Sequence, residues 1–192
     1  MNIKKIIIGK QFEDSANLEE LIGIVNKKRV KVIQVTANMK ISIEKNIYFD
    51  VLWPQNYKPI NENRLNNNSL VLKLNYIRND DKFSILFTGD IEKKAEELLI
   101  NKYKYTNMLN STILKVAHHG SKTSMAEEFL KLVNPKIALI GVGKKNTFGH
   151  PNIEVIERLK KIKCRIYRTD EDGEISILVD KKGRLSINKF IK

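Results

Sequence analysis

Short apolar runs alternate with polar segments along the whole chain, and this pattern predicts strands interleaved with helices. The runs typical of strands cover residues 3–8, 30–35, 41–43, 47–53, 69–76, 83–88, 113–117, 136–142, 165–168, 174–179 and 184–188. Apolar residues at helical spacing predict helices over 17–29, 91–101, 124–133 and 151–162. No repeat or linker interrupts the pattern. It therefore predicts one α/β domain over residues 1–192.

Polar residues mark several of the predicted boundaries. Ser124 and Glu127 have the spacing of a capping box. His150 precedes Pro151, which suits the first position of a helix, so His150 is predicted to be the N-cap. The polar stretch 55–68 is predicted to be a loop that lies over the site or over solvent.

Composition narrows the function only a little. The net charge of +13 would suit a polyanionic partner, but 28 of the 35 basic residues are lysines that accompany many Ile and Asn residues, as a general bias in composition would produce. Cys164 is the only cysteine, which excludes an internal disulfide and predicts a small core residue. Apolar runs are too short for a signal peptide or a membrane span of ~20 residues, so the chain is expected to be cytoplasmic.

Candidate chemistry lies where two predicted strands end. Asp90 follows the run 83–88, and His118 and His119 follow the run 113–117. An acid and an imidazole that converge at one edge of a sheet suggest a metal site. Taken alone, Asp90 is more typical of a helix N-cap, but the adjacent histidines favour the site. Because side chains alternate along a strand, one histidine is expected to be a ligand and the other a supporting donor or a substrate contact.

A second group of candidates would contact substrate. Ser121 follows the histidine pair, and Lys144 and Lys145 lie in a glycine-bounded loop that precedes His150. This loop would wrap a polyanion or would simply be a solvated surface. At a helix start, His150 would either contact a phosphate or serve only as a cap.

Four motifs carry a family resemblance. In order they are Leu86-Phe87-Thr88-Gly89-Asp90, Leu114-Lys115-Val116-Ala117-His118-His119-Gly120-Ser121, Gly149-His150-Pro151 and Tyr167-Arg168-Thr169-Asp170-Glu171-Asp172-Gly173. Together they resemble the C-terminal metallo-β-lactamase-fold domain of ComEC-type competence proteins, which internalise DNA. The resemblance implies an αββα sandwich with a metal-dependent phosphodiesterase site that acts on DNA strands.

The resemblance also assigns roles by position. Asp90 matches the family's metal-bridging carboxylate, the pair His118-His119 matches its downstream histidine ligands, and His150 matches a histidine on the substrate side. The complete family site holds a divalent metal, zinc or manganese. Full-length members are membrane proteins.

One departure from the family pattern changes the expectation. The family's main metal-binding loop, of the form H-x-D-x-D-H, should precede all these motifs, yet no histidine occurs before His118. The chain is therefore expected to be the C-terminal two-thirds of the family's domain, incomplete at the N-terminus, with the alternative that it binds no metal by itself.

Three functions follow as hypotheses. The first is a metal-dependent phosphodiesterase of DNA uptake that a partner polypeptide completes. The second is a non-catalytic fragment that binds polyanions or a partner chain, and the third is a small-molecule hydrolase of the same fold. Strands over 3–8 and 30–35 would lack neighbours and expose apolar surface, so a homo-oligomer or a completing chain is the expected partner besides DNA.

Overall fold

A computed structural model of the chain describes residues 3–10, 16–78, 81–180 and 183–190. Its centre is a seven-stranded sheet whose strands follow one another in chain order. The strands are β3 (Lys40–Glu44), β4 (Ile47–Trp53), β5 (Val71–Arg78), β6 (Asp81–Phe87), β7 (Ile113–Lys115), β8 (Ile137–Ile140) and β9 (Arg165–Arg168). Neighbours from β3 to β6 are antiparallel, and those from β6 to β9 are parallel.

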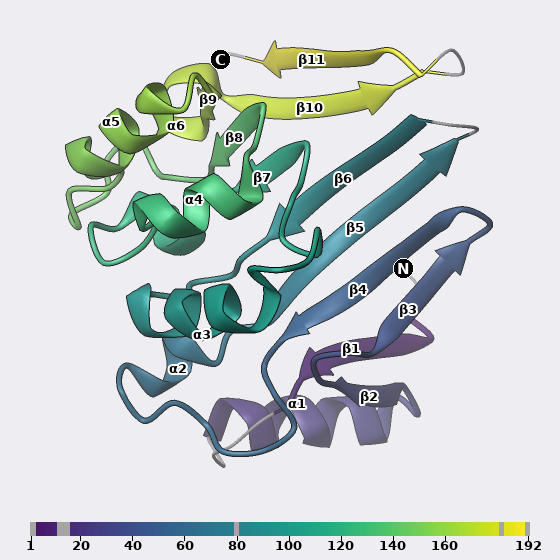
Figure 1. The fold of residues 1–192 in the computed structure, drawn as a ribbon. Coiled ribbons are helices and arrows are strands. Elements are labelled where there is room, and N and C mark those ends of the chain that lie inside the picture. Colours follow the sequence, from purple (N-terminus) through teal and green to yellow (C-terminus); the bar gives the residue numbers. More distant parts are fainter. Residues whose placement is uncertain (1–2, 11–15, 79–80, 181–182, 191–192) are drawn as a thin grey trace.

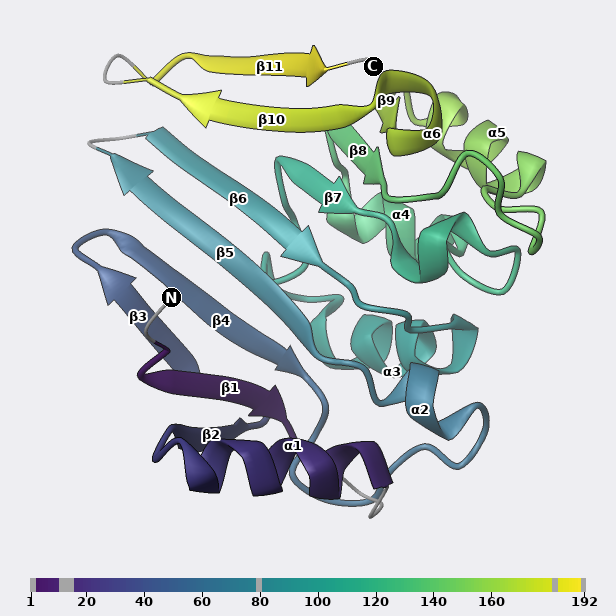
Figure 2. The same ribbon diagram turned by 180° about the vertical axis from the view of Figure 1, so that it is seen from behind.

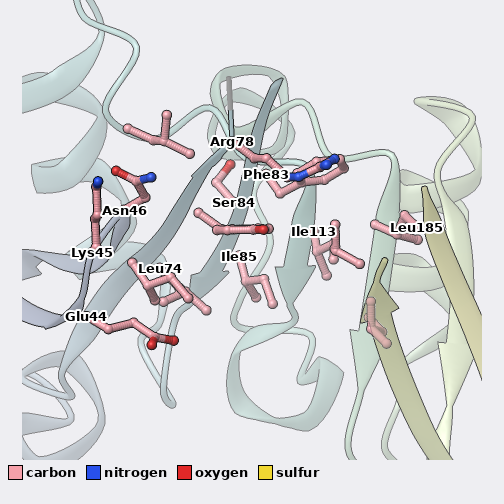
Figure 3. Close-up of a pocket in the computed structure, with 15 residues that line it drawn as sticks. Glu44, Lys45, Asn46, Leu74, Arg78, Phe83, Ser84, Ile85, Ile113 and Leu185 are labelled. Atoms are coloured by element: carbon pink, nitrogen blue, oxygen red, sulfur yellow. The ribbon is translucent and has the colours of Figure 1, made fainter. Parts of the chain in front are cut away.

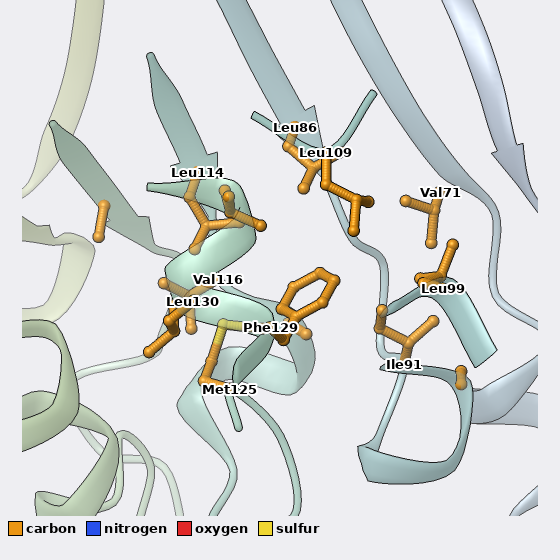
Figure 4. Packing of buried hydrophobic residues seen from close by; sticks show 14 of the residues in the cluster. Val71, Leu86, Ile91, Leu99, Leu109, Leu114, Val116, Met125, Phe129 and Leu130 are labelled. Carbon is orange, nitrogen blue, oxygen red and sulfur yellow. The ribbon is translucent and has the colours of Figure 1, made fainter. Parts of the chain in front are cut away.

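Helices connect the parallel strands and cover one face of this sheet (Figure 1). The three longer ones are α3 (Lys93–Tyr103), α4 (Glu127–Val133) and α5 (Ile153–Lys161). Three single turns, α2 (Arg64–Asn67), the 3-10 turn η1 (Ala117–Gly120) and α6 (Thr169–Asp172), complete this part. Figure 4 shows the core between helices and sheet, where Leu86 and Leu114 pack with Phe129 of α4. All three side chains are fully buried, so this layer excludes water and supplies most of the hydrophobic stabilisation.

Two small sheets lie beside the large one. A parallel pair is formed by β1 (Lys5–Gly9) and β2 (Lys31–Val35), joined by α1 (Ala16–Lys27). An antiparallel hairpin is formed by β10 (Glu174–Val179) and β11 (Leu185–Phe190). They lie at opposite sides of the large sheet, with β1 and β2 near β4 and the hairpin near β8 and β9 (Figures 1 and 2). The mixed α/β class predicted from the sequence is therefore confirmed.

Helix starts are where the sequence prediction is wrong. α5 begins at Ile153, and its N-cap is Asn152, whose side chain accepts a hydrogen bond from the amide of Glu154 at 3.0 Å. His150 is therefore not the cap of this helix. Ser124 does not cap α4 either, since its hydroxyl donates to the carbonyls of residues 117 and 121.

A buried glutamate from another helix holds the start of α4. The carboxylate of Glu96, in α3, accepts hydrogen bonds from the amides of Met125 (2.6 Å) and Ala126 (2.8 Å). Arg158 of α5 donates to the carbonyl of Met125 at 3.1 Å, so all three helices meet at this loop. Burial raises the pKa of Glu96 to about 7, although the two amide hydrogen bonds and Arg158 oppose the shift.

An apolar groove lies between the large sheet and the C-terminal hairpin (Figure 3). Its volume is about 640 Å³. Leu74 and Ile85 form part of its floor, and Ile177 and Leu185 of the hairpin form one wall. Polar residues of the turn between β3 and β4, among them Lys45, line one end of the groove. A groove of this composition on a partly open sheet face favours association.

Two predictions made from the sequence concern Cys164 and the possibility of a membrane span. Cys164 is buried, and burial raises the pKa of its thiol to about 12, as suits a core residue rather than a nucleophile. Within the described residues, every helix is too short or too polar to span a lipid bilayer.

The first prediction concerns Glu96 and pH. Between pH 4.5 and about 7 the folded protein keeps a proton on Glu96 that the unfolded chain has released, so stability should fall as pH rises through this window. The loss is at most about 3 kcal/mol. Glu96→Gln cannot titrate, so the difference in unfolding free energy between wild type and variant should change across the window. Urea unfolding at several pH values measures it.

Glu97→Gln is the matched control, because the Glu97 side chain is 45% exposed on the same helix and its ion pair among the described residues is with Lys94 at 3.2 Å. Its stability curve should run parallel to that of the wild type. A Glu96→Gln curve that is also parallel would contradict the assignment.

The second prediction concerns the groove. We expect the purified chain to form oligomers as its concentration rises, because burying the groove residues removes apolar surface from water. Leu185→Lys should shift the population towards monomer, whereas Leu65→Lys, at a side chain that is 80% exposed outside the groove, should not. Light scattering at moderate salt distinguishes these outcomes, and a wild type that stays monomeric throughout would contradict the prediction.

Candidate functional site

The loops that follow β6, β7 and β8 meet at one edge of the large sheet. Asp90 lies in the first loop, and His118 and His119 lie in the turn after β7. His150 ends the loop after β8. Because β6, β7 and β8 are parallel, their carboxyl ends share this edge. In open α/β sheets, ligands bind outside the carboxyl ends of the strands.

The turn that carries the two histidines has a strained backbone. His118 (φ 47°) and His119 (φ 55°) both adopt left-handed conformations, each of which costs on the order of 1–3 kcal/mol for a residue other than glycine. Neighbouring contacts hold them there. The His118 amide donates to the carbonyl of Gly89 at 3.2 Å. The Thr88 hydroxyl donates to the carbonyl of Lys115 at 2.6 Å, so the ends of β6 and β7 are bound together.

Two glycines allow these loops to approach their neighbours. Gly89 has φ 54°, and a Cβ there would lie 2.7 Å from the Cβ of Ser69. Gly120 has φ 82°, and a Cβ there would lie 2.7 Å from the Cβ of Pro151. Any larger residue would push the loops apart, so both positions require glycine.

Asp90 and His119 face each other at this edge. Oδ1 of Asp90 lies 4.0 Å from Nε2 of His119, and their side chains are 44% and 50% exposed. Nδ1 of His119 is hydrogen-bonded to the carbonyl of Gly141 at 2.5 Å. Because a carbonyl can only accept, Nδ1 carries the proton, and Nε2 of a neutral ring presents its lone pair. At this separation the two atoms are too far apart to share a proton in a hydrogen bond, whereas a metal ion about 2 Å from each would fit between them.

This geometry confirms the predicted approach of Asp90 to one of the two histidines. It also answers the alternative that Asp90 is a helix cap. α3 begins at Lys93, its N-cap residue is Glu92, and no side chain of that cap residue makes the capping hydrogen bond. Asp90 lies outside the helix and is available to a ligand.

His118 faces a different acid, Glu92, which sequence reasoning did not place at the site. Nδ1 of His118 lies 3.2 Å from Oε1 of Glu92, whose side chain is only 8% exposed. The two groups are at ion-pair distance but not aligned as a hydrogen bond, and Nδ1 has no hydrogen-bond partner among the described residues.

Hydrogen bonds keep Glu92 ionised. The side-chain amides of Asn63 and Asn66 donate to its two carboxylate oxygens. Burial alone would raise the pKa of Glu92, but these bonds, another from Thr123 and the nearby His118 together lower it. A negative charge therefore lies against the imidazole of His118.

Asn67 anchors this arrangement from α2. Its side chain is fully buried, and Oδ1 accepts hydrogen bonds from the amides of Glu92 (3.0 Å) and Ala95 (3.3 Å) at the start of α3. Its Nδ2 donates to the carbonyl of Glu62 at 2.9 Å, and its own carbonyl accepts from the indole of Trp53 at 2.7 Å. The segment predicted as a loop thus contains a helical turn that caps α3 and lies beside the site.

The imidazole ring of His150 lies next to that of His118, beside the two acid–histidine pairs. Its ring centre lies 5.6 Å from that of His118 in an edge-to-face arrangement. Asn146 binds the backbone of His150 on both sides, accepting from its amide at 3.0 Å and donating to its carbonyl at 2.8 Å. Burial lowers the pKa of His150, and the nearby His118 and His119 lower it further.

The other predicted substrate contacts differ in exposure. Lys144 and Lys145 are exposed in the loop after β8. Ser121 is buried, and its hydroxyl is hydrogen-bonded to that of Thr123 at 2.9 Å. The structure thus brings together Asp90 and the histidines, and Lys144 and Lys145 lie exposed in the loop that leads to His150.

Lys115 is a second residue that the sequence did not single out. It ends β7, and its ammonium group donates to the carbonyl of Val116 at 2.8 Å. Burial lowers the pKa of Lys115, while the charge of Asp90 opposes this shift. Lys115 lies in the motif that contains the two histidines, but nothing in the sequence gave it a role, whereas Glu92 had one signal, its place two residues after Asp90.

Metal ligands at this edge are too few for a complete centre. Among the described residues, no group of three or more His, Cys, Asp or Glu side chains is placed to hold a metal ion. Zinc sites use three or four protein ligands. Asp90 and His119 therefore supply at most part of a ligand set and do not by themselves fit a zinc or manganese site.

The chain is similar in sequence to segments of several longer proteins. No family model matches it. It is 33% identical over 173 residues to ComE operon protein 3 of Bacillus subtilis (strain 168), which is 90% of this chain and 21% of that protein. It is 32% identical to Recombination protein 2 of Haemophilus influenzae over 68% of this chain and 15% of that protein. It is 35% identical to Competence protein ComA of Neisseria gonorrhoeae over 56% of this chain and 16% of that protein. The chain thus spans about a fifth or less of each relative.

The third prediction concerns Asn67. Asn67→Ala should lower the free energy of unfolding by about 2–6 kcal/mol, because two buried amides at the start of α3 lose their acceptor and each unsatisfied group costs about 1–3 kcal/mol. Urea unfolding measures the change. Asn66→Ala, which removes one hydrogen bond of 3.3 Å to Glu92, should cost no more than about 1 kcal/mol. Equal losses in the two variants would contradict the role given to Asn67.

Proposed function

We propose, from the premise that this chain is homologous to one segment of the ComEC-type competence proteins, that it acts on DNA during uptake as part of a metal-dependent phosphodiesterase domain. The observation that carries the proposal is the approach of Asp90 to His119, 4.0 Å apart, at the carboxyl edge of the parallel strands. Their lone pairs converge on a position that suits a cation, and a strained turn holds one of them there.

The proposed fold is a metallo-β-lactamase-like αββα sandwich formed by residues 1–192 as a single domain. The seven-stranded sheet with its helices would be one half of the sandwich. The β1–β2 pair and the β10–β11 hairpin, which lie at opposite sides of that sheet, would belong to the other half. Further strands between them would complete it.

Asp90 and His119 would be two ligands of the divalent metal, zinc or manganese. The remaining ligands would come from outside these 192 residues, because the described part of the chain offers no third ligand near the pair. A bound metal would activate water and stabilise charge on a phosphate. This chain's own contribution is to orient the two ligands, through the Gly141 carbonyl on His119 and the contact between Gly89 and His118.

Positive charge would bring the DNA strand to this edge. Lys144 and Lys145 lie exposed in the loop that ends at His150, and the chain as a whole carries a net charge of +13. Lysines at such positions bind phosphates by Coulomb attraction and release counterions, so affinity falls as salt rises. His150, with a lowered pKa, would contact substrate as a neutral ring.

The alternative function is a non-catalytic domain that binds polyanions or a partner chain. The same shortage of ligands favours it, and so does the apolar groove, which a completing polypeptide would fill. The two functions predict the same behaviour for the chain alone and differ once the remaining ligands are supplied.

The fourth prediction tests the DNA binding and the incomplete metal site on which the proposed function depends. The purified chain should bind labelled single-stranded DNA, with affinity that falls steeply with salt, and should show little or no cleavage with zinc or manganese. Lys144→Ala combined with Lys145→Ala should weaken binding and reduce the slope of log affinity against log salt by about 1.4. Fluorescence anisotropy at several salt concentrations measures both.

Lys27→Ala combined with Lys28→Ala is the matched control, because it removes the same charge at the end of α1, away from the site. Its slope should stay near that of the wild type. Failure of the wild type to bind DNA would overturn the proposed function. Cleavage by the chain alone, abolished by Asp90→Ala, would show that the metal site is complete without other ligands.

A further inference from the structure

We propose that the loop between β8 and α5 carries a binding site for an unpaired nucleobase, centred on Phe148 and adjoining the Asp90–His119 pair. This inference rests on the proposed function, because it assigns a DNA strand to the same edge of the sheet. It adds the part of the strand that the site holds and the side chain that holds it.

Phe148 is an aromatic ring presented to solvent on a fixed support. Its side chain is 80% exposed. The loop that carries it is closed by Asn146, whose side chain binds the carbonyl of Gly143 at 3.0 Å as well as both backbone groups of His150. Three hydrogen bonds that involve the Asn146 side chain hold this loop in one shape, so the ring of Phe148 is presented to solvent from a fixed support.

A row of rings joins Phe148 to the candidate site. The ring of Phe148 stacks on that of His150, with centres 6.0 Å apart and planes 20° apart. His150 in turn meets His118 edge to face at 5.6 Å. A base that stacks on Phe148 would therefore lie at the end of an aromatic series that leads to the histidine turn.

A cavity connects the same residues. Its volume is about 360 Å³, within the range of small-ligand sites, and its lining includes Phe148, His150 and His119. Gly143 also lines it, and a Cβ there would meet no atom within 4 Å, so this position is not crowded by neighbouring atoms. His119 belongs both to this cavity and to the pair with Asp90, so a nucleotide in the cavity would place its phosphate near that pair.

Other exposed aromatic residues lack this setting. Tyr57 is 70% exposed but lines a separate cavity with Trp53 and Leu98. Tyr105 is 89% exposed and lies against the ammonium group of Lys104. Among the described residues, Phe148 is a strongly exposed ring that shares a cavity with His119.

The chemistry of the lining selects the ligand. The faces of a base are apolar and stack on an aromatic ring, whereas its phosphates would be met by Lys144 and Lys145 of the same loop. A paired base is stacked inside the duplex and cannot present a free face to Phe148. The site therefore fits single-stranded DNA, and because every base has such a face it should discriminate little among sequences.

The fifth prediction uses the 192-residue chain and two labelled strands of about eight nucleotides, one of thymidine and one with the same phosphates but abasic sugars. Phe148→Ala should weaken binding of the thymidine strand by about 5- to 100-fold and leave the abasic strand unchanged. Phe148→Trp should keep the wild-type affinity for both. Fluorescence anisotropy gives the affinities, and circular dichroism checks that each variant is folded.

The outcomes separate this inference from the proposed function. Equal binding of the thymidine strand by wild type and Phe148→Ala would overturn the base site and leave the DNA function intact. Equal loss for both strands would mean that Phe148 supports the loop rather than a base, and would also overturn the inference. A wild type that binds neither strand would overturn the proposed function itself.

Discussion

The hydrogen bond from the His118 amide to the Gly89 carbonyl joins the two loops on which the sheet edge depends. Two successive left-handed residues would relax if nothing held them. The bond to Gly89 holds the first, and the carbonyl of Gly141 holds the ring of the second, His119. A Cβ on Gly89 would lie only 2.7 Å from the Cβ of Ser69, so a larger residue there would displace the loop after β6 that accepts this bond. Asp90 and the histidines are placed by backbone contacts rather than by each other.

A buried group of polar side chains around Glu92 supports this edge of the sheet. Glu92 lies between the amides of Asn63 and Asn66 and the ring of His118, and it stays ionised although it is buried. Ionised groups in such positions persist only when hydrogen bonds replace the lost water. The site thus has an exposed acid–histidine pair, Asp90 with His119, and a buried one that supports it. The buried pair, Glu92 with His118, holds one face of the turn, and the exposed pair, Asp90 with His119, faces the solvent.

Local patterns of the sequence predicted what depends on local structure. Apolar runs identified the strands because burial on two faces requires consecutive apolar residues, and the rule that polar groups gather at strand ends identified Asp90 and the histidines. The start of α5 was predicted two residues early because Asn152, not His150, supplies the local cap. The starts of α3 and α4 are held by partners far along the chain. Glu96 binds an amide 30 residues away, and Asn67 binds one 28 residues away. No spacing rule reveals such a pair. Glu92 was missed despite its place near Asp90, because the side chains that bind it, Asn63 and Asn66, lie 29 and 26 residues away.

The strand order of the large sheet follows the chain from β3 to β9. Each new strand therefore meets a partner that has already been synthesised, which keeps the pairing contacts short in sequence. On the ribosome, β6, β7 and the turn with the two histidines emerge before α5 and the C-terminal hairpin. The strands that carry Asp90 and His119 are therefore made before the hairpin that forms one wall of the groove, so the edge of the sheet and the groove depend on different stages of synthesis.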